Sequence, residues 1–410
     1  MKYVIVLADG AADYPVQQLG GRTPLQAAAT PTLDYMAQRG EMGLVRTVPP
    51  GLAAGSDIAN LSVMGYDPRR YYSGRSPFEA ASMGVEMQPG DVSFRCNLVT
   101  LSDDEPYSGK RMLDYCAGQI SSDEARELIA ELNEALATEK IRFYPGVGYR
   151  HLILWREGPY DWQFTPPHDI SGQVIEPFLP RGREKEVILE LMVKSHRLLK
   201  DHPVNRKRGE RGLNPANSIW VWGEGRRPQL PSFAEKYGVR GAVISAVDLV
   251  KGIGICAGLE SIPVEGADGT LNTNFAGKAR AAVEALLNGL DFVFVHLEAP
   301  DECGHRGEIE NKVRSLELID QQLVREIMEG LAEAGVNFKL MFLPDHPTPL
   351  ALGTHTGDPV PFLIYRSGAA DVKPGLSFDE AAAGKSSCFV EEGFKLMDYF
   401  LDKAPLAAIL

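Results

Sequence analysis

Three short apolar runs stand out along the chain, and each ends at a cluster of charged or polar residues. The runs cover residues 3–7, 292–297 and 340–343. Strands that are buried on both faces of a parallel sheet are nearly all apolar, so each run predicts such a strand. In open α/β sheets the ligand crevice lies at the carboxyl ends of the strands. The polar clusters at Asp9, residues 298–301 and residues 345–346 are therefore expected on one edge of the sheet.

A central stretch has a pattern of its own. It contains further strand signals at residues 92–98, 151–155 and 218–222, and amphipathic helical patterns near 122–137 and 184–199. Pro89, Gly90 and the region of Gly238 mark its ends. We therefore predict an α/β protein in which residues 1–87 and 251–410 form a core domain, with a mostly parallel central sheet flanked by helices. Residues 88–250 are predicted to form a smaller, inserted α+β domain.

Composition limits the classes of partner. The 410 residues are 44% hydrophobic and 24% charged, with a formal net charge of −13, which argues against a nucleic-acid or membrane-surface partner. No stretch approaches the roughly 20 apolar residues of a membrane span. The five cysteines are odd in number and scattered, which favours a reducing cytoplasm. The single basic cluster, formed by Arg206, Lys207, Arg208 and Arg211, is interpreted as a solvated loop rather than a phosphate site.

Carboxylates and histidines gather in the last third of the chain. Asp301 and His305 are four residues apart beyond an apolar run, Asp345 and His346 follow the next run, and His355 comes nine residues later. Mixed Asp and His ligands suit Mn²⁺ or Zn²⁺ better than Ca²⁺. An isolated Asp-x-x-x-His equally fits a capping aspartate and a surface histidine. With Asp9 and Ser56, however, there are seven candidate ligands, enough for the two metal sites that phosphoryl transfer uses.

Ser56 is the candidate nucleophile. Small residues precede it in the segment 51–55, and a helical pattern follows it. Alone, Ser56 would be interpreted as an ordinary helix N-cap. A phosphate carried on its hydroxyl would nevertheless meet free backbone N–H groups and the positive end of the helix dipole. A metal ion would also lower the pKa of the hydroxyl and supply an alkoxide near neutral pH.

Several cationic or imidazole side chains are candidates for binding an anionic substrate. Arg75 follows a glycine and can bind an anion with two parallel hydrogen bonds. The central stretch adds Arg95, His151 and His168 near predicted strand ends or turns. For each of these residues taken singly, a structural role is an open alternative.

These motifs resemble those of the cofactor-independent phosphoglycerate mutases, in particular their shorter archaeal-type branch within the alkaline phosphatase superfamily. The likeness runs from residue 3 to about residue 364. The family pattern contains a strand ending in Asp-Gly, a Gly-Ser-Asp nucleophile segment, an Asp-x-x-Gly-His segment, an Asp-His pair and a late Thr-His followed by Thr or Ser. In this chain these are residues 9–10, 55–57, 301–305, 345–346 and 354–356.

The resemblance implies an alkaline-phosphatase-like core and a ligand set for two divalent cations. It assigns Asp9, Ser56, Asp345 and His346 to one metal, and Asp301, His305 and His355 to the other. Manganese is the expected ion, while magnesium, cobalt and zinc serve in some members. The family mechanism passes the phosphoryl group of phosphoglycerate to the serine and returns it to the other hydroxyl without bisphosphoglycerate. The implied substrate-binding residues are Arg75, Arg95, His151, His168 and Lys251.

One departure from the archaeal pattern bears on the substrate. Residues 217–225, together with residues 71–80, look like a bacterial subgroup for which a homoserine kinase role has been proposed. Three hypotheses therefore remain: a mutase, another phosphoserine enzyme such as a phosphatase or homoserine kinase, and a non-catalytic metal-stabilised protein. Structural metal sites favour Cys and His over this carboxylate-rich set, which disfavours the third. No P-loop motif occurs. The expected partner is a small phosphorylated molecule, and the oligomeric state stays open.

Overall fold

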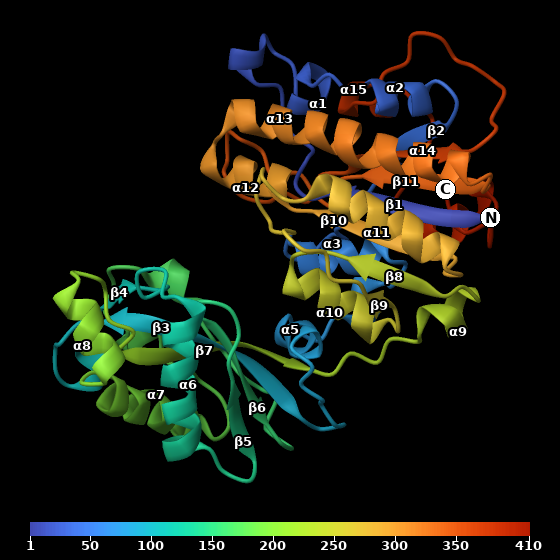
Figure 1. Cartoon of the computed structure of the whole chain (residues 1–410). Coiled ribbons are helices and arrows are strands. Elements are labelled where there is room, and N and C mark those ends of the chain that lie inside the picture. The colour runs from blue at the N-terminus through green and yellow to red at the C-terminus, as the bar shows by residue number, and fades with distance from the viewer. The chain divides into compact units, whose positions relative to one another are not determined.

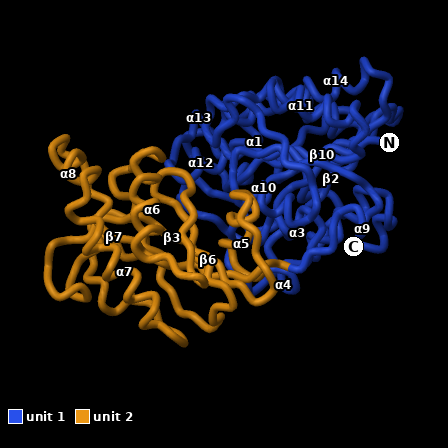
Figure 2. The backbone as a smooth tube through the Cα atoms, turned by 60° about the horizontal axis from the view of Figure 1, so that its bottom comes forward, with its two compact units in different colours: residues 1–72, 229–410 blue, residues 73–228 orange.

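The computed structural model describes residues 1–410, and the chain divides into two compact units. Unit 1 comprises Met1–Tyr72 and Gln229–Leu410, and unit 2 comprises Ser73–Pro228 (Figure 2). The boundaries differ from the predicted ones at residues 87/88 and 250/251. Helix α5 (Ser76–Ser82) packs on three strands of unit 2, whereas strand β8 (Gly241–Ile244) pairs within the sheet of unit 1. Both elements therefore lie on the side of the boundary opposite to the prediction.

Unit 1 is built on an eight-stranded sheet in the order β13-β2-β12-β11-β1-β10-β8-β9. Five of its seven neighbouring pairs are parallel, and only β12 runs antiparallel to its neighbours. The prediction of a mostly parallel central sheet is therefore confirmed. The strands of unit 1 besides β8 are β1 (Lys2–Ala8), β2 (Glu41–Val45), β9 (Glu260–Ser261), β10 (Phe292–Leu297), β11 (Phe338–Leu343), β12 (Val360–Arg366) and β13 (Phe389–Val390).

Helices cover both faces of this sheet (Figure 1). Alternate residues of β1 and β10, such as Val4 and Val293, face a core formed with helices α2, α11, α13 and α14. The intervening residues face the other layer, where Phe292 stacks on Phe233 of α9 and Val243 contacts Gly254 of α10. The helices of unit 1 are α1 (Pro24–Ala27), α2 (Pro31–Ala37), α3 (Ser56–Val63), α4 (Pro68–Tyr71), α9 (Phe233–Tyr237), α10 (Asp248–Cys256), α11 (Phe275–Leu287), α12 (Ala299–Arg306), α13 (Ile309–Ile319), α14 (Arg325–Glu333), α15 (Glu380–Gly384) and α16 (Leu396–Phe400).

Unit 2 is an α+β unit around a five-stranded antiparallel sheet, as predicted for the inserted region. The long strand β3 is central and pairs with β4, β6 and β7. The two predicted amphipathic helices are confirmed as α6 (Ser122–Leu136) and α7 (Lys185–Leu199), whose apolar sides join the core of this unit. The strands are β3 (Val92–Leu101), β4 (Met112–Asp114), β5 (Ile141–Tyr144), β6 (Arg150–Trp155) and β7 (Ser218–Arg226).

The basic cluster of unit 2 is exposed at three of its four residues, but it differs from the predicted solvated loop in being mostly helical and in the burial of Arg208. It lies on helix α8 (Pro203–Glu210) and the residue after it, and Arg208 is only 2% exposed. Nε of Arg208 donates to the carbonyl of Asn214, while its Nη groups donate to Glu124 and to the carbonyl of Ala117. Arg208 is therefore a structural connection between helices and loops, whereas Arg206, Lys207 and Arg211 are exposed. None of the helices in the chain combines the length and apolar character needed to cross a bilayer.

Candidate active site

The predicted metal ligands come together at the carboxyl ends of three neighbouring strands. Strand β1 lies between β10 and β11, in a register that pairs Ala8 with Leu297 and Leu7 with Leu343. Asp9, Asp301 and Asp345 follow these strand ends within a few residues. Each strand is mostly apolar and largely buried, and the acidic side chains come only after the strand ends. The predicted common edge is therefore present.

Asp9, Asp345 and His346 form one group that can hold a metal ion. One candidate ligand atom from each residue lies within 4.8 Å of the other two, and all three residues are buried. Nε2 of His346 is 3.4 Å from Oδ2 of Asp345 and 3.6 Å from Oδ1 of Asp9. Oγ of Ser56 is 3.1 Å from the same nitrogen. The first ligand set implied by the sequence is therefore assembled.

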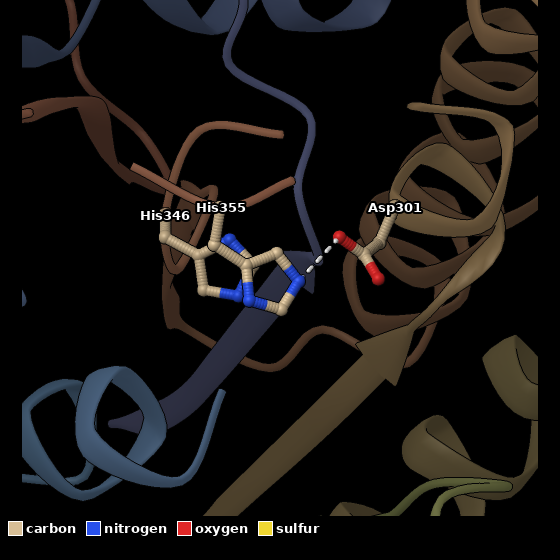
Figure 3. A group of neighbouring side chains, drawn as sticks. All are labelled: Asp301, His346 and His355. Atoms are coloured by element: carbon tan, nitrogen blue, oxygen red, sulfur yellow. Dashed lines mark ion pairs between the residues drawn. The ribbon is translucent and has the colours of Figure 1, made fainter. Parts of the chain in front are cut away.

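Asp301, His346 and His355 form a second group of the same kind. Figure 3 shows the rings of His346 and His355 side by side, with the His355 ring directed at the Asp301 carboxylate, 3.3 Å away. His305 joins this group, because its Nε2 is 3.2 Å from Oδ2 of Asp301 and 2.9 Å from Nε2 of His355. The two groups meet at His346, whose ring centroid is 4.0 Å from that of His355.

The electrostatics of the groups favour a bound cation. Burial, followed by the negative charges of Asp345 and Asp301, raises the pKa of Asp9 well above its usual range. Oδ1 of Asp9 is also buried without a hydrogen-bond partner. An unpartnered carboxylate oxygen among other carboxylates is costly unless positive charge compensates it. The donor set, with carboxylates and imidazoles converging on that oxygen, therefore fits a divalent metal such as Mn²⁺ or Zn²⁺.

The two imidazoles His305 and His346 have pKa values shifted in opposite directions. Hydrogen bonding to Asp301 raises the pKa of His305 to about 9, against the opposing effect of burial. Burial lowers the pKa of His346, and a neutral imidazole is the form that binds a metal. For Asp301, burial would raise the pKa, but hydrogen bonds with His305 and His355 outweigh it and hold the pKa well below its usual value. Asp301 is thus held as a carboxylate.

Ser56 is not an N-cap. Gly55 occupies the cap position of α3, and Ser56 is the first residue of the helix. Asn60, one turn later, donates from its amide to the carbonyl of Ser56 and to Oδ2 of Asp345. The hydroxyl of Ser56 is thereby held at the start of the helix and beside His346.

Three supporting residues of this site were missed from the sequence. His296 Nε2 is 2.9 Å from Oδ2 of Asp9, Asn60 contacts Asp345, and Thr348 Oγ1 contacts Oδ1 of Asp301. Such partners orient metal ligands and are part of a working site. The four-residue spacing from Ser56 to Asn60 was a usable signal, and so was a histidine within the apolar run of β10. Thr348 carried no such signal.

Unit 2 contains a separate cluster of cationic side chains. Glu79 on α5 bridges two of the predicted arginines: Oε1 accepts from Nε of Arg75 and Oε2 from Nε of Arg95, each at 3.0 Å. The guanidinium of Arg95 lies 4.2 Å from the ring centroid of Trp222. The ring centroid of His168 lies 5.6 Å from that of Trp222, so His168 borders the same cluster. Glu79 was missed, although its spacing of four residues from Arg75 is the ion-pair spacing of a helix.

Two predicted substrate-binding residues are not part of this cluster. His151 pairs with Cys96 in the β3/β6 ladder, whereas Arg95 pairs with Leu152, so the two side chains lie on opposite faces of the sheet. Nδ1 of His151 accepts from the backbone of Gly146, and its Nε2 is buried without a partner. Burial lowers the pKa of His151 to about 3. Lys251 lies in unit 1 on α10, where its Nζ is 3.2 Å from Asp248.

Known proteins match the chain over nearly its full length. The family model described as 2,3-bisphosphoglycerate-independent phosphoglycerate mutase matches residues 37–205. A probable mutase of this name from Geobacter sulfurreducens is 53% identical, covering 98% of this chain and all of its own. A mutase of the same name from Methanosarcina barkeri is 51% identical and covers 94% and 96%. The solved structure of a cofactor-independent phosphoglycerate mutase from Thermoplasma acidophilum is 28% identical, with a TM-score of 0.66, over 98% and 99% of the two chains.

Proposed function

The chain belongs to the family of 2,3-bisphosphoglycerate-independent phosphoglycerate mutases, and on this basis we propose that it interconverts 2-phosphoglycerate and 3-phosphoglycerate through a phosphoserine at Ser56. One observation carries the assignment of the serine. Its hydroxyl lies 3.1 Å from His346, at the point where two groups of potential metal ligands meet. A serine among aspartates and histidines is expected where a phosphoryl group is transferred, and has no evident purpose in a structural metal site.

Two divalent cations, with manganese as the first choice, are the cofactors that we propose. Asp9, Ser56, Asp345 and His346 would hold one of them. Asp301, His305 and His355 would hold the other. When bound, such ions offset the charge of the carboxylates and act as Lewis acids toward the phosphoryl oxygens. The buried and unpartnered Oδ1 of Asp9 supports this proposal from the geometry alone.

The chemistry at Ser56 consists of two transfers in opposite directions. Oγ of Ser56 forms a bond to phosphorus while the bond from phosphorus to the substrate oxygen breaks, and the freed glycerate hydroxyl gains the proton that the serine loses. In the return transfer, the other hydroxyl of glycerate forms a bond to phosphorus while the bond from phosphorus to Oγ of Ser56 breaks, and the proton that this hydroxyl loses returns to the serine. Ser56 opens α3, so backbone N–H groups at the helix N-terminus can stabilise the phosphate that it carries. Asn60 keeps this first turn in place.

The arginine cluster of unit 2 is proposed to bind the carboxylate of the substrate. Guanidinium groups recognise carboxylates through paired hydrogen bonds. Arg75 and Arg95 are held near each other because each donates a hydrogen bond to Glu79. His168 borders the same cluster, and burial lowers its pKa, so it would act as a neutral group near pH 7. Lys251 is proposed as a further substrate-binding residue. His151 faces away from the cluster and is not included.

The test uses the purified protein with Mn²⁺ and 3-phosphoglycerate. We expect 2-phosphoglycerate to form, measured through an enolase-coupled assay, and a phosphoryl group to be found on the peptide that contains Ser56. Ser56→Ala should abolish both signals while keeping the fold and most of the bound metal, because the hydroxyl is one ligand of several. If Ser56→Ala retains most of the turnover, the phosphoserine route is wrong. ATP-dependent phosphorylation of homoserine, without mutase turnover, would instead support the kinase alternative.

A further inference from the structure

Glu79 is the one carboxylate that links Arg75 to Arg95. Each of its oxygens accepts one Nε–H at 3.0 Å, and its side chain is 16% exposed. Arg75 stands at the start of α5 and Arg95 in the middle of β3, so Glu79 connects a helix to the sheet of unit 2. Two guanidinium groups repel each other, and the carboxylate between them offsets that repulsion.

The orientation of Arg95 is fixed from two directions. Glu79 holds its Nε, and the ring of Trp222 covers one face of its guanidinium plane at 4.2 Å. The side chain is 11% exposed, so little freedom of movement remains. Because Glu79 takes Nε alone, the two Nη groups of Arg95 stay available for an oxyanion. A donor group aligned before its ligand arrives loses less entropy on binding.

The charge of the cluster remains positive after this pairing. Two guanidinium groups and one carboxylate leave one net positive charge, and the charge of Arg150 also acts on Arg95. Arg150 pairs with Asn97, two residues from Arg95, and is thus on the same face of the sheet. The cluster can therefore bind an anion with Glu79 in place, and Glu79 need not leave.

We propose that Glu79 is a positioning residue that aligns Arg75 and Arg95 for the carboxylate shared by phosphoglycerate and glycerate. The proposal rests on the function proposed above. Once the phosphoryl group has moved to Ser56, glycerate can be held only by its carboxylate and hydroxyl groups. If it dissociates, water attacks the phosphoserine: a bond forms between the water oxygen and phosphorus, the Oγ–phosphorus bond breaks, and serine and inorganic phosphate result. Glu79 would then set the ratio of mutase turnover to hydrolysis.

A second bridge in unit 2 provides a matched control. Glu124 also joins two arginines, with Oε2 at 2.6 Å from Arg208 and Oε1 at 3.3 Å from Arg211. The Glu124 bridge differs from the Glu79 bridge because the other nitrogens of Arg208 donate to backbone carbonyls. The variants Glu79→Gln and Glu124→Gln therefore each neutralise a carboxylate between two arginines, with no change in side-chain size. Glu79→Asp keeps the charge and changes only the reach.

The experiment measures three quantities in the Mn²⁺-loaded protein: KM for 3-phosphoglycerate, inorganic phosphate released per 2-phosphoglycerate formed, and the affinity for glycerate from tryptophan fluorescence. For Glu79→Gln we expect KM and phosphate release per turnover to rise about tenfold each, and glycerate to bind about tenfold more weakly. Glu79→Asp should recover part of each loss. Glu124→Gln should leave all three within about twofold of the parent.

Two results would overturn the positioning role. One is a Glu79→Gln protein whose KM, phosphate ratio and glycerate affinity match those of the parent. The other is a Glu124→Gln protein that shifts the phosphate ratio as far as Glu79→Gln does, since a general loosening of unit 2 would then explain both. The proposed function fails separately, if the parent forms neither 2-phosphoglycerate nor phosphoserine. In that case the glycerate affinities of the same variants still decide whether Glu79 aligns the arginines.

Discussion

Unit 2 contains two carboxylates that each bridge a pair of arginines, and the pairs differ in what their other donors do. At Glu124, each of the three guanidinium nitrogens of Arg208 donates to a group of the chain, and we call this bridge saturated in that sense. At Glu79, the guanidinium of Arg95 uses Nε alone and packs on the ring of Trp222. We call this the open bridge, because the Nη groups of Arg95 are not used by Glu79. Both arginines are buried, at 2% and 9% exposure.

The difference separates arginines that hold a fold together from arginines that can bind a ligand. A buried donor without a partner is costly, so a structural arginine is expected to have a partner for each of its three nitrogens. A ligand-binding arginine must instead keep donors for the ligand, and its remaining contacts fix only its direction. Saturation of the donors, rather than burial or the presence of an ion pair, is therefore the criterion that distinguishes Arg208 from Arg95.

Removing Arg95 should have the largest effect, and it should fall on activity. Arg95→Ala deletes the proposed carboxylate contact and leaves Glu79 with one cation, so we expect kcat/KM to fall about a thousandfold, or about 4 kcal/mol of transition-state stabilisation. Thermal unfolding should change little by comparison. Steady-state kinetics with the enolase-coupled assay and a melting curve measure the two effects. If the variant loses stability but keeps its kcat/KM per folded molecule, Arg95 is a structural arginine like Arg208.

Removing Arg208 should lower the stability of the protein and leave its substrate affinity unchanged. Arg208→Ala deletes three hydrogen bonds of a buried side chain and leaves two backbone carbonyls without their donor, so we expect the free energy of unfolding to fall by about 3 kcal/mol. The folded fraction should keep a normal KM for 3-phosphoglycerate. Urea unfolding, followed by kinetics below the transition, measures both. A large rise in KM would show that the saturated bridge also serves the substrate.

Trp222 tests whether the aromatic ring contributes to the open bridge. Trp222→Ala removes the surface on which Arg95 rests, and we expect KM to rise about tenfold, in line with a partly buried cation–π contact. Trp222→Phe keeps a ring and should recover most of the affinity. If the Ala and Phe variants have equal KM values, the hydrogen bond to Nε of Arg95 suffices and the stack is incidental.

Much of unit 1 could be predicted from the sequence because its signals are local. Strands β1, β10 and β11 are mostly apolar runs, and each is followed closely by a metal-binding type of residue. The parallel arrangement then brings those residues to one edge, whatever the details of packing. The predicted common edge for Asp9, Asp301 and Asp345 is present, because β1 lies between β10 and β11 in the sheet.

Unit 2 was harder to predict because its site depends on register and on partners distant in sequence. Arg150 and His151 are adjacent, yet alternation along β6 places only Arg150 on the face of Arg95. The burial of Arg208 depends on carbonyl groups at residues 117 and 214, which no local pattern reveals. The same reasoning explains the boundary at residue 72: α5 is joined to β3 through Glu79, and the sequence around residues 87–90 signals only a turn.

The exposed partners of the two bridges should show the smallest effect and provide the finest distinction between them. Arg211 is 63% exposed and pairs with Glu124 at 3.3 Å, so Arg211→Ala should change the free energy of unfolding by less than about 0.5 kcal/mol. KM should not change either, because Arg211 belongs to the saturated bridge at Glu124.

Arg75 is 40% exposed and pairs with Glu79 at 3.0 Å. By exposure alone, Arg75→Ala would be equally silent. We expect it instead to raise KM with little change in stability, because its guanidinium belongs to the open bridge. Parallel melting curves and KM measurements on the two variants decide this, and equal KM values for both would mean that donor saturation does not separate binding arginines from structural ones in this unit.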